Sequence, residues 1–154
     1  MTTVENRVAE LGESIPTVAA PAANYIPWNK TGKLILTSGQ LPFLDGKLVA
    51  TGLLGKDVDT KTGQIAARHC ALNVLGVLKA ACDGDLNRIK RIVKITVFVA
   101  AAPDFHEAHI VANGASDLLV AAFGDNGRHA RSAVGMAVLP LNAPVEVEVI
   151  AELA

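Results

Sequence analysis

The chain has 154 residues, of which 51% are hydrophobic and 19% are charged, and its formal net charge is −1. These values exclude a disordered chain and predict a single domain, residues 1–154, with a hydrophobic core of its own. The near-neutral charge lacks the footprint of a nucleic-acid-binding protein, and no apolar run approaches the ~18 residues of a membrane span, so we expect neither nucleic acid nor a membrane as a partner.

The first part of the chain predicts a short helix followed by a connecting segment. Val4, Val8 and Leu11 recur at helical spacing before Gly12, which is typical of an amphipathic helix within an N-terminal extension of residues 1–20. Residues 14–24 contain two prolines and are expected to lie on the surface. The charged first residues lack the apolar stretch of a signal peptide, so we expect a cytoplasmic protein.

A hairpin comes next. Residues 25–28 and 34–38 predict two strands joined by a turn at Thr31-Gly32-Lys33, and Asp45-Gly46 marks a second turn before residues 47–50.

Two helices and a long strand make up the middle of the chain. Asp59 or Thr60 is the expected N-cap of the first helix, which ends at Asp83-Gly84-Asp85. Residues 89–101 alternate as a strand, and Asp104 is the expected cap of a second helix over 105–123, in which Gly114 predicts close packing. The first helix presents a continuous apolar stripe: Ala67, Ala71, Val74, Leu75, Leu78, Ala81 and Cys82.

Two cysteines, Cys70 and Cys82, lie in the first of these helices. Their separation along the helix axis is ~18 Å, far beyond the reach of a disulfide. We expect them to be buried free thiols in a reducing compartment.

The last part of the chain contains two apolar strands that flank a turn at 139–144, and each carries an ionic group, Arg131 in the first and Glu146 in the second. If this turn closes a hairpin, Arg131 and Glu146 lie roughly 25 Å apart, and they can meet only at a boundary between subunits. The element order predicts an α+β fold, in which two helices cover one face of a single mixed or antiparallel sheet. The other face is apolar as well, which favours an oligomer.

Several familiar site motifs are absent from the sequence. His106 and His109 are spaced at i and i+3, which is not the spacing of zinc proteases, and we predict no metal site. No glycine-rich phosphate loop and no nucleophile elbow is present.

Three blocks of sequence together resemble a known family. They are residues 34–42, residues 93–99, and residues 130–140 with 145–148. In this order they resemble the Rid (reactive intermediate deaminase, YjgF-type) family over about Pro21 to the C-terminus. The added N-terminal helix and residues 111–119 resemble a longer branch of that family.

The resemblance implies a chorismate-mutase-like α+β fold and a homotrimer whose sheets pack into a central barrel. It also implies hydrolysis of enamine or imine intermediates, such as 2-aminoacrylate, to a 2-keto acid and ammonia without metal or organic cofactor. Arg131 then binds the carboxylate of a small-molecule substrate, and Glu146 orients the water. Tyr25, Ser38 and Gly39 are the corresponding pocket residues. Arginine suits this role because its planar donor pair matches a carboxylate, and a nearby glutamate can move a proton during attack on C=N.

Two positions depart from the family pattern. Ala133 stands where many relatives have Cys, which excludes thiol chemistry and leaves a backbone N–H near Ala133 as an added donor. His109 stands where a pocket Asn is common, so we expect it to contact the ligand. Glu148, two residues after Glu146, remains an alternative to it.

Two other functions compete with the deaminase. A non-catalytic trimer that binds keto acids or amino acids through Arg131 and regulates a partner is consistent with Ala133 and His109. RNA cleavage is disfavoured, because the chain has no basic groove with aromatic side chains.

Overall fold

The structure is a computed structural model that describes residues 3–18 and 23–154. Its helices are α1 (Val4–Glu10), α2 (Thr60–Ala81) and α3 (Ala108–Phe123), with short 3-10 turns at Leu86–Arg88, Gly124–Gly127 and Pro140–Asn142. Its strands are β1 (Trp28–Thr31), β2 (Leu34–Thr37), β3 (Phe43–Leu44), β4 (Lys47–Leu48), β5 (Ile89–Ala100), β6 (Ala130–Met136) and β7 (Val145–Leu153).

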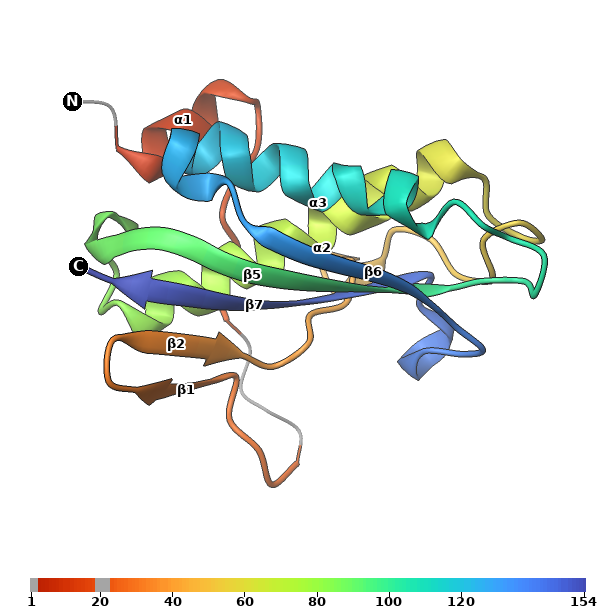
Figure 1. Cartoon of the computed structure of the whole chain (residues 1–154), viewed down its shortest axis with the longest axis horizontal. Helices are drawn as coiled ribbons and strands as arrows, with labels where there is room; N and C mark the ends of the chain where they lie inside the picture. The colour runs from red at the N-terminus through yellow and green to blue at the C-terminus, as the bar shows by residue number, and fades with distance from the viewer. Residues whose placement is uncertain (1–2, 19–22) are drawn as a thin grey trace.

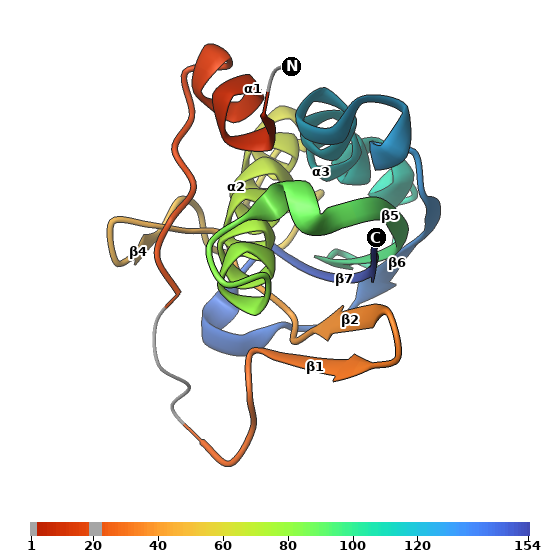
Figure 2. The same cartoon turned by 90° about the vertical axis from the view of Figure 1, so that its left-hand side faces the viewer.

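The main sheet is mixed, with the strand order β1-β2-β7-β5-β6. β6 runs parallel to β5, and the other neighbouring pairs are antiparallel. Figures 1 and 2 show α2 and α3 side by side on one face of this curved sheet, with α1 at the end of α3. The predicted α+β fold with two helices on one face is therefore confirmed.

The core lies between the sheet and the two long helices. In β7, Val145, Val147, Val149 and Ala151 are buried, and they alternate with half-exposed residues on the other face. Every member of the predicted α2 stripe is buried as well. Asp59 caps α2 by accepting a 2.7 Å hydrogen bond from the Thr62 amide, as predicted.

The pairing of the last two strands differs from the predicted hairpin. β6 and β7 do not pair with each other, because β5 lies between them and pairs with both. α3 makes the crossover that a parallel β5–β6 pair requires, and residues 137–144 then carry the chain past the end of β5 to its other edge. Two apolar runs joined by a turn do not reveal that a third strand inserts between them.

Two element boundaries also differ from the predictions. α3 begins at Ala108 with Glu107 as its N-cap, because residues 102–105 form a turn in which the Phe105 amide donates to the Ala102 carbonyl. β1 begins at Trp28 instead of Tyr25. Pro27 precedes it and has no N–H to donate to a ladder.

The N-terminal segment confirms the predicted helix and runs on across α2. α1 has a Thr3 cap and buries Val4 and Val8. After it, Glu13 forms a 2.7 Å ion pair with Arg68 of α2. Cys70 and Cys82 are free and buried, as expected. No helix within the described ranges is long and apolar enough to cross a membrane.

Candidate functional site

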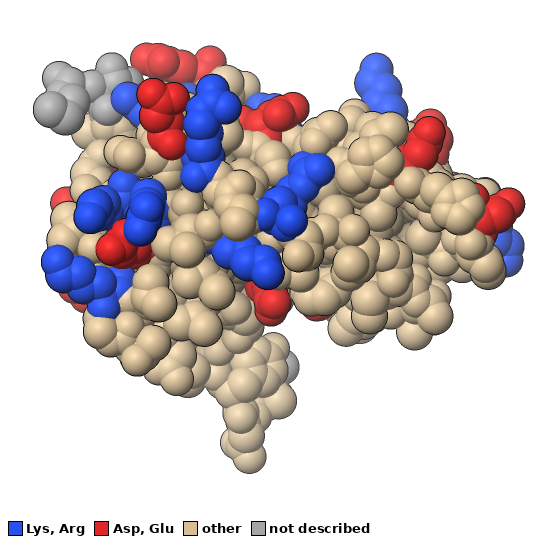
Figure 3. All heavy atoms as spheres, viewed as in Figure 1, with Lys and Arg blue, Asp and Glu red and all other residues tan. Residues whose placement is uncertain are grey.

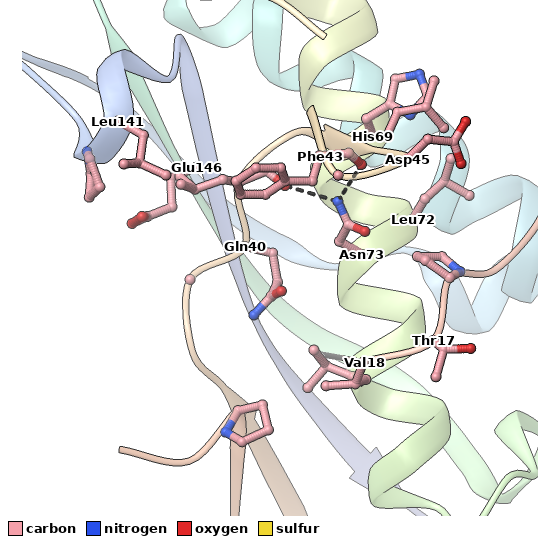
Figure 4. A pocket seen from close by; sticks show the side chains of 18 of the residues that line it. Thr17, Val18, Gln40, Phe43, Asp45, His69, Leu72, Asn73, Leu141 and Glu146 are labelled. Carbon is pink, nitrogen blue, oxygen red and sulfur yellow. Dashed lines mark hydrogen bonds between the residues drawn. The ribbon is translucent and has the colours of Figure 1, made fainter. Parts of the chain in front are cut away.

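The predicted site residues fall into two groups in the folded chain. Tyr25, Gly39 and Glu146 line one open pocket of about 900 Å³, which lies between the end of β2, α2 and residues 14–18 (Figure 4). Arg131, His109 and Ala133 belong to a second place, where β6 meets α3. We describe the pocket first.

Glu146 extends from the face of β7 that points away from the helices, since its neighbours Val145 and Val147 are buried in the core. Its carboxylate lies against the Gly39 backbone, and a Cβ at Gly39 would stand 2.7 Å from Oε2. Burial raises the pKa of the Glu146 carboxyl, and the negative charge of Glu148 adds to this effect. A carboxyl with a raised pKa holds and releases a proton more readily near neutral pH.

Ser38 precedes Gly39 in the chain but is not among the residues that line the pocket. Its hydroxyl donates to the Ile26 carbonyl at 2.6 Å, and its amide donates to the Pro27 carbonyl at 2.8 Å. These bonds fasten the segment that carries Tyr25, whose side chain is largely exposed, to the end of β2. The Ser38 hydroxyl is therefore already hydrogen-bonded to the backbone, and it links the end of β2 to the segment that carries Tyr25.

Asn73 of α2 is a pocket residue that the sequence analysis missed. Its side-chain amide donates to the carbonyls of Leu41, at 2.9 Å, and Phe43, at 3.0 Å, and so holds the β3–β4 hairpin over the pocket (Figure 4). An amide within the apolar α2 pattern was the available signal, because such a group needs a polar partner when it is partly buried.

Arg131 lies on the opposite face of the sheet, toward α3. It stands beside Ile95 of β5, which is buried under the helices. Its Nη1 donates to Asn113 Oδ1 at 2.9 Å and to Ser116 Oγ at 3.2 Å, and its Nη2 donates to the His109 carbonyl at 3.1 Å. His109 therefore contributes its backbone to the site, and Ala133 follows two residues later on the same face of β6.

These contacts leave one edge of the Arg131 guanidinium available. The group has five N–H hydrogens in one plane, and three of them go to α3. Within the described parts of the chain, no partner takes Nε–H or the second hydrogen of Nη2. Nε and Nη2 share one edge of the guanidinium, and an edge of this kind can bind a carboxylate through both oxygens.

Ser116 and His129 support Arg131 from behind and were not predicted in this role. Ser116 Oγ lies 2.9 Å from His129 Nε2, and His129 Nδ1 lies 2.6 Å from the Gly127 carbonyl oxygen. Burial lowers the pKa of His129 and the charge of Arg131 adds to this, while the bond to Gly127 acts in the opposite direction. The sequence offered one signal, since His129 lies two residues before Arg131 and alternates onto the same strand face.

The two groups are separated within one chain, though by less than a hairpin would impose. Arg131 stands beside Ile95 and Glu146 beside Phe98, three residues apart along β5, with β5 itself between them. Strand geometry then gives roughly 14 Å between their backbone positions. The side chains also point to opposite faces of the sheet. The sequence-based value of roughly 25 Å rested on the incorrect hairpin, although the conclusion that the two groups stay apart in one chain holds.

A family model described as "YjgF/chorismate_mutase-like, putative endoribonuclease" matches residues 5–153. The chain belongs to this family. The resemblance drawn from three sequence blocks is thereby confirmed. Among the relatives of this chain, protein TCP17 of Trypanosoma cruzi is 48% identical over 97% of this chain and 94% of its own length. The 2-iminobutanoate/2-iminopropanoate deaminase of Salmonella typhimurium is 33% identical over 92% of this chain and 98% of its own length.

Solved structures of the family share the fold to different extents. A protein of unknown function from Agrobacterium tumefaciens, 50% identical, superimposes with a TM-score of 0.93 over 98% of this chain and 92% of that chain. Escherichia coli TdcF with bound serine, 25% identical, gives a TM-score of 0.59 over 90% of this chain and 93% of that chain. The YjgF-like fold is thus common to all three proteins, and the Agrobacterium structure superimposes on this chain more closely than TdcF does.

Proposed function

We propose that this protein is a cofactor-free hydrolytic deaminase that converts small enamine or imine intermediates, such as 2-aminoacrylate, to a 2-keto acid and ammonia. The observation that carries the proposal is the guanidinium of Arg131, which α3 holds at three hydrogen atoms while two adjacent donors stay open. A fixed, permanently charged donor pair selects a planar carboxylate.

The chemistry that follows needs one water and one proton carrier. The enamine first tautomerises to the imine, whose carboxylate binds the open edge of Arg131. Glu146 takes a proton from a water as the water oxygen attacks the C=N carbon, and it passes this proton to the nitrogen, which gives a carbinolamine. Glu146 then takes the hydroxyl proton of the carbinolamine and gives it to the nitrogen, so that the C=O bond forms as the C–N bond breaks and ammonia leaves. Water and imine thus become keto acid and ammonia, with Glu146 regenerated. The raised pKa of Glu146 suits a group that must work in both directions.

The proposal places the complete site between subunits of a homotrimer. Arg131 and Glu146 lie on opposite faces of one sheet, so a small substrate cannot contact both within one chain. A second copy that brings its Glu146 pocket to the Arg131 of the first would complete the site. In support, the sheet face away from the helices carries exposed apolar side chains, with Leu36 39% exposed and Val134 43% exposed. The expected central barrel of packed sheets would cover this face.

The relatives support the same chemistry. The deaminase of Salmonella typhimurium is named for the imines of butanoate and propanoate, both small and carboxylate-bearing. TdcF was solved with serine, which also carries a carboxylate. Neither Arg131 nor Glu146 requires a thiol at position 133 for the steps above, so Ala133 is compatible with the reaction.

A non-catalytic binding trimer is the second candidate. The open edge of Arg131 is sufficient by itself to hold a keto acid or an amino acid, whereas hydrolysis also needs Glu146 at the same ligand. Saturable binding of 2-ketobutyrate without turnover of imines would favour this candidate.

The deaminase is tested by adding the purified protein to 2-aminoacrylate that a lyase generates in the same cuvette, and by following keto-acid release. We expect the wild type to accelerate release and Arg131→Ala to lower kcat/KM about 100-fold, because two charge-assisted hydrogen bonds are lost. Arg128→Ala is the matched control, since Arg128 is exposed and its side chain pairs with Asp125 at 3.3 Å. Undiminished acceleration by Arg131→Ala would defeat the proposal.

A further inference from the structure

Arg131 is held by more than its direct partners. Ser116 belongs to α3, and a serine in a helix commonly bonds to the carbonyl one turn before it. Here its hydroxyl instead lies between two side chains of the neighbouring strand and its lead-in, Arg131 Nη1 at 3.2 Å and His129 Nε2 at 2.9 Å. The serine therefore connects the histidine to the arginine.

The direction of each hydrogen bond between Gly127, His129, Ser116 and Arg131 follows from the two outer groups, the Gly127 carbonyl and the Arg131 guanidinium. The Gly127 carbonyl can only accept, so His129 carries its proton on Nδ1, which lies 2.6 Å from that oxygen. Arginine can only donate, so the Ser116 oxygen accepts from Nη1. The single hydroxyl hydrogen then points to Nε2, which accepts it in the neutral ring. The lowered pKa of His129 agrees with a neutral ring at pH 7.

We propose that Ser116 and His129 are a positioning pair for Arg131, in which neutral His129 orients the Ser116 hydroxyl and thereby holds the guanidinium with its Nε–Nη2 edge open for a carboxylate. This inference rests on the proposed function, because it takes the ligand of that edge to be the substrate. It adds a requirement to the proposed function: the Ser116 hydroxyl needs a hydrogen-bond acceptor at the position of His129 Nε2.

Two substitutions of His129 distinguish its role as a hydrogen-bond acceptor from a role in which the ring only fills space. The amide of glutamine reaches the position of Nε2 and supplies an oxygen that can accept from Ser116. The shorter amide of asparagine reaches only the position of Nδ1, so it keeps the bond to Gly127 and leaves Ser116 without an acceptor. His106→Asn is the control, because His106 is an exposed histidine outside this network.

The test measures the deamination kinetics of the full chain with each variant. We expect KM to stay within about two-fold of wild type for His129→Gln and to rise about five-fold for His129→Asn, with kcat unchanged in both, because one neutral hydrogen bond that supports ligand binding is removed. Equal KM values for His129→Gln and His129→Asn would overturn the proposal that His129 and Ser116 position Arg131. If His129→Asn does not fold, Ser116→Ala removes the same link and must raise KM to a similar extent.

A second measurement is independent of the reaction. Long-range ¹H–¹⁵N correlation spectra of the wild type at pH 7 are expected to show His129 protonated on Nδ1, and protonation on Nε2 would overturn the proposal. If imines are not turned over, the same variants are compared by calorimetric titration with 2-ketobutyrate. If the wild type neither turns over imines nor binds 2-ketobutyrate, the proposed function fails, and the tautomer of His129 alone decides the positioning pair.

Discussion

At the scale of single residues, two glutamates on β7 show how burial and pairing act in opposite directions. Burial raises the pKa of Glu146, and the nearby charge of Glu148 adds to the shift. Glu152, six residues on, accepts a 2.6 Å bond from Arg91 Nε, and this bond lowers its pKa. Glu146 is therefore held in an environment that disfavours its charge, which is typical of a functional carboxyl, whereas Glu152 is a structural ion-pair partner.

This contrast predicts how stability responds to pH. A raised pKa means that the folded chain binds the Glu146 proton more tightly than the unfolded chain does. Its contribution to stability is therefore present at low pH and is lost as pH rises past the ordinary glutamate range. Glu146→Gln is always neutral, so we expect it to melt at a higher temperature than wild type at pH 7 and at nearly the same temperature at pH 4.

Glu152→Gln is the matched control with the opposite sign. The lowered pKa of Glu152 contributes stability above the ordinary glutamate range, and this contribution is lost as pH falls through the lowered value. Thermal melts at both pH values should show this variant below wild type at pH 7, with a smaller difference at pH 4. A Glu146→Gln protein that melts below wild type at pH 7 would contradict the assigned environment.

The types of residue in the sequence, together with the three blocks that resemble the family, allowed Arg131 and Glu146 to be predicted as site residues. Arg131 and Glu146 are recognisable because each places a charge in an apolar strand, where an ionic group without a partner is costly to bury. Ser116, Asn113 and His129 are not recognisable in this way. Each is an ordinary polar residue, and its role depends on α3 and β6 being brought together by β5.

At the scale of elements, the contact between α2 and α3 depends on Gly114. A Cβ at this position would overlap the Gln64 carbonyl of α2. In addition, the Gln64 side chain donates to the Ile110 carbonyl of α3 at 3.0 Å. The two helices thus meet backbone to backbone, and the close packing predicted from a glycine inside a helix is present. This contact also sets the position of Asn113 and Ser116, which flank Gly114.

Gly114→Ala is therefore expected to destabilise the protein by about 2 kcal/mol, because overpacking outweighs the ~1 kcal/mol by which alanine favours a helix. Asp117→Ala is the control, since Asp117 is exposed on the same helix and its replacement tests helix propensity alone. Urea denaturation gives the free energy of unfolding for each. Similar stabilisation in the two variants would show that the helices can separate at Gly114 without loss.

The elements themselves were largely predictable, but their pairing was not. The α2 stripe and the alternation of β5 follow from short-range periodicity, and both elements lie close to where the sequence placed them. The partners of β6 and β7 depend on which edges of β5 are free, and a sequence pattern contains no information on this. The insertion of β5 between them also separates Arg131 from Glu146 within one chain.

At the scale of the whole molecule, the sheet has one face packed under helices and another that no element of the described chain covers. Exposed apolar side chains of β2 and β6 stand on that bare face, together with the half-exposed Glu146 and Glu148. On the face seen in Figure 3, Lys and Arg gather toward the left, while much of the right half carries no charge. The exposed apolar side chains on this uncovered face are the basis for the proposed association with further copies of the chain.

The decisive prediction at this scale concerns two inactive variants that restore each other. If every site takes Arg131 from one subunit and Glu146 from its neighbour, Arg131→Ala and Glu146→Gln subunits complement each other when mixed. In a random 1:1 assembly, half of the arginine donors and half of the glutamate donors are intact, so about a quarter of the sites are complete in a cyclic oligomer. We expect about a quarter of wild-type keto-acid release after the two variants are refolded together, against almost none when each is refolded alone. A mixture no more active than its separate components would place both residues of each site in one chain, and the roughly 14 Å and the sheet between them would then exclude their joint action on one small substrate.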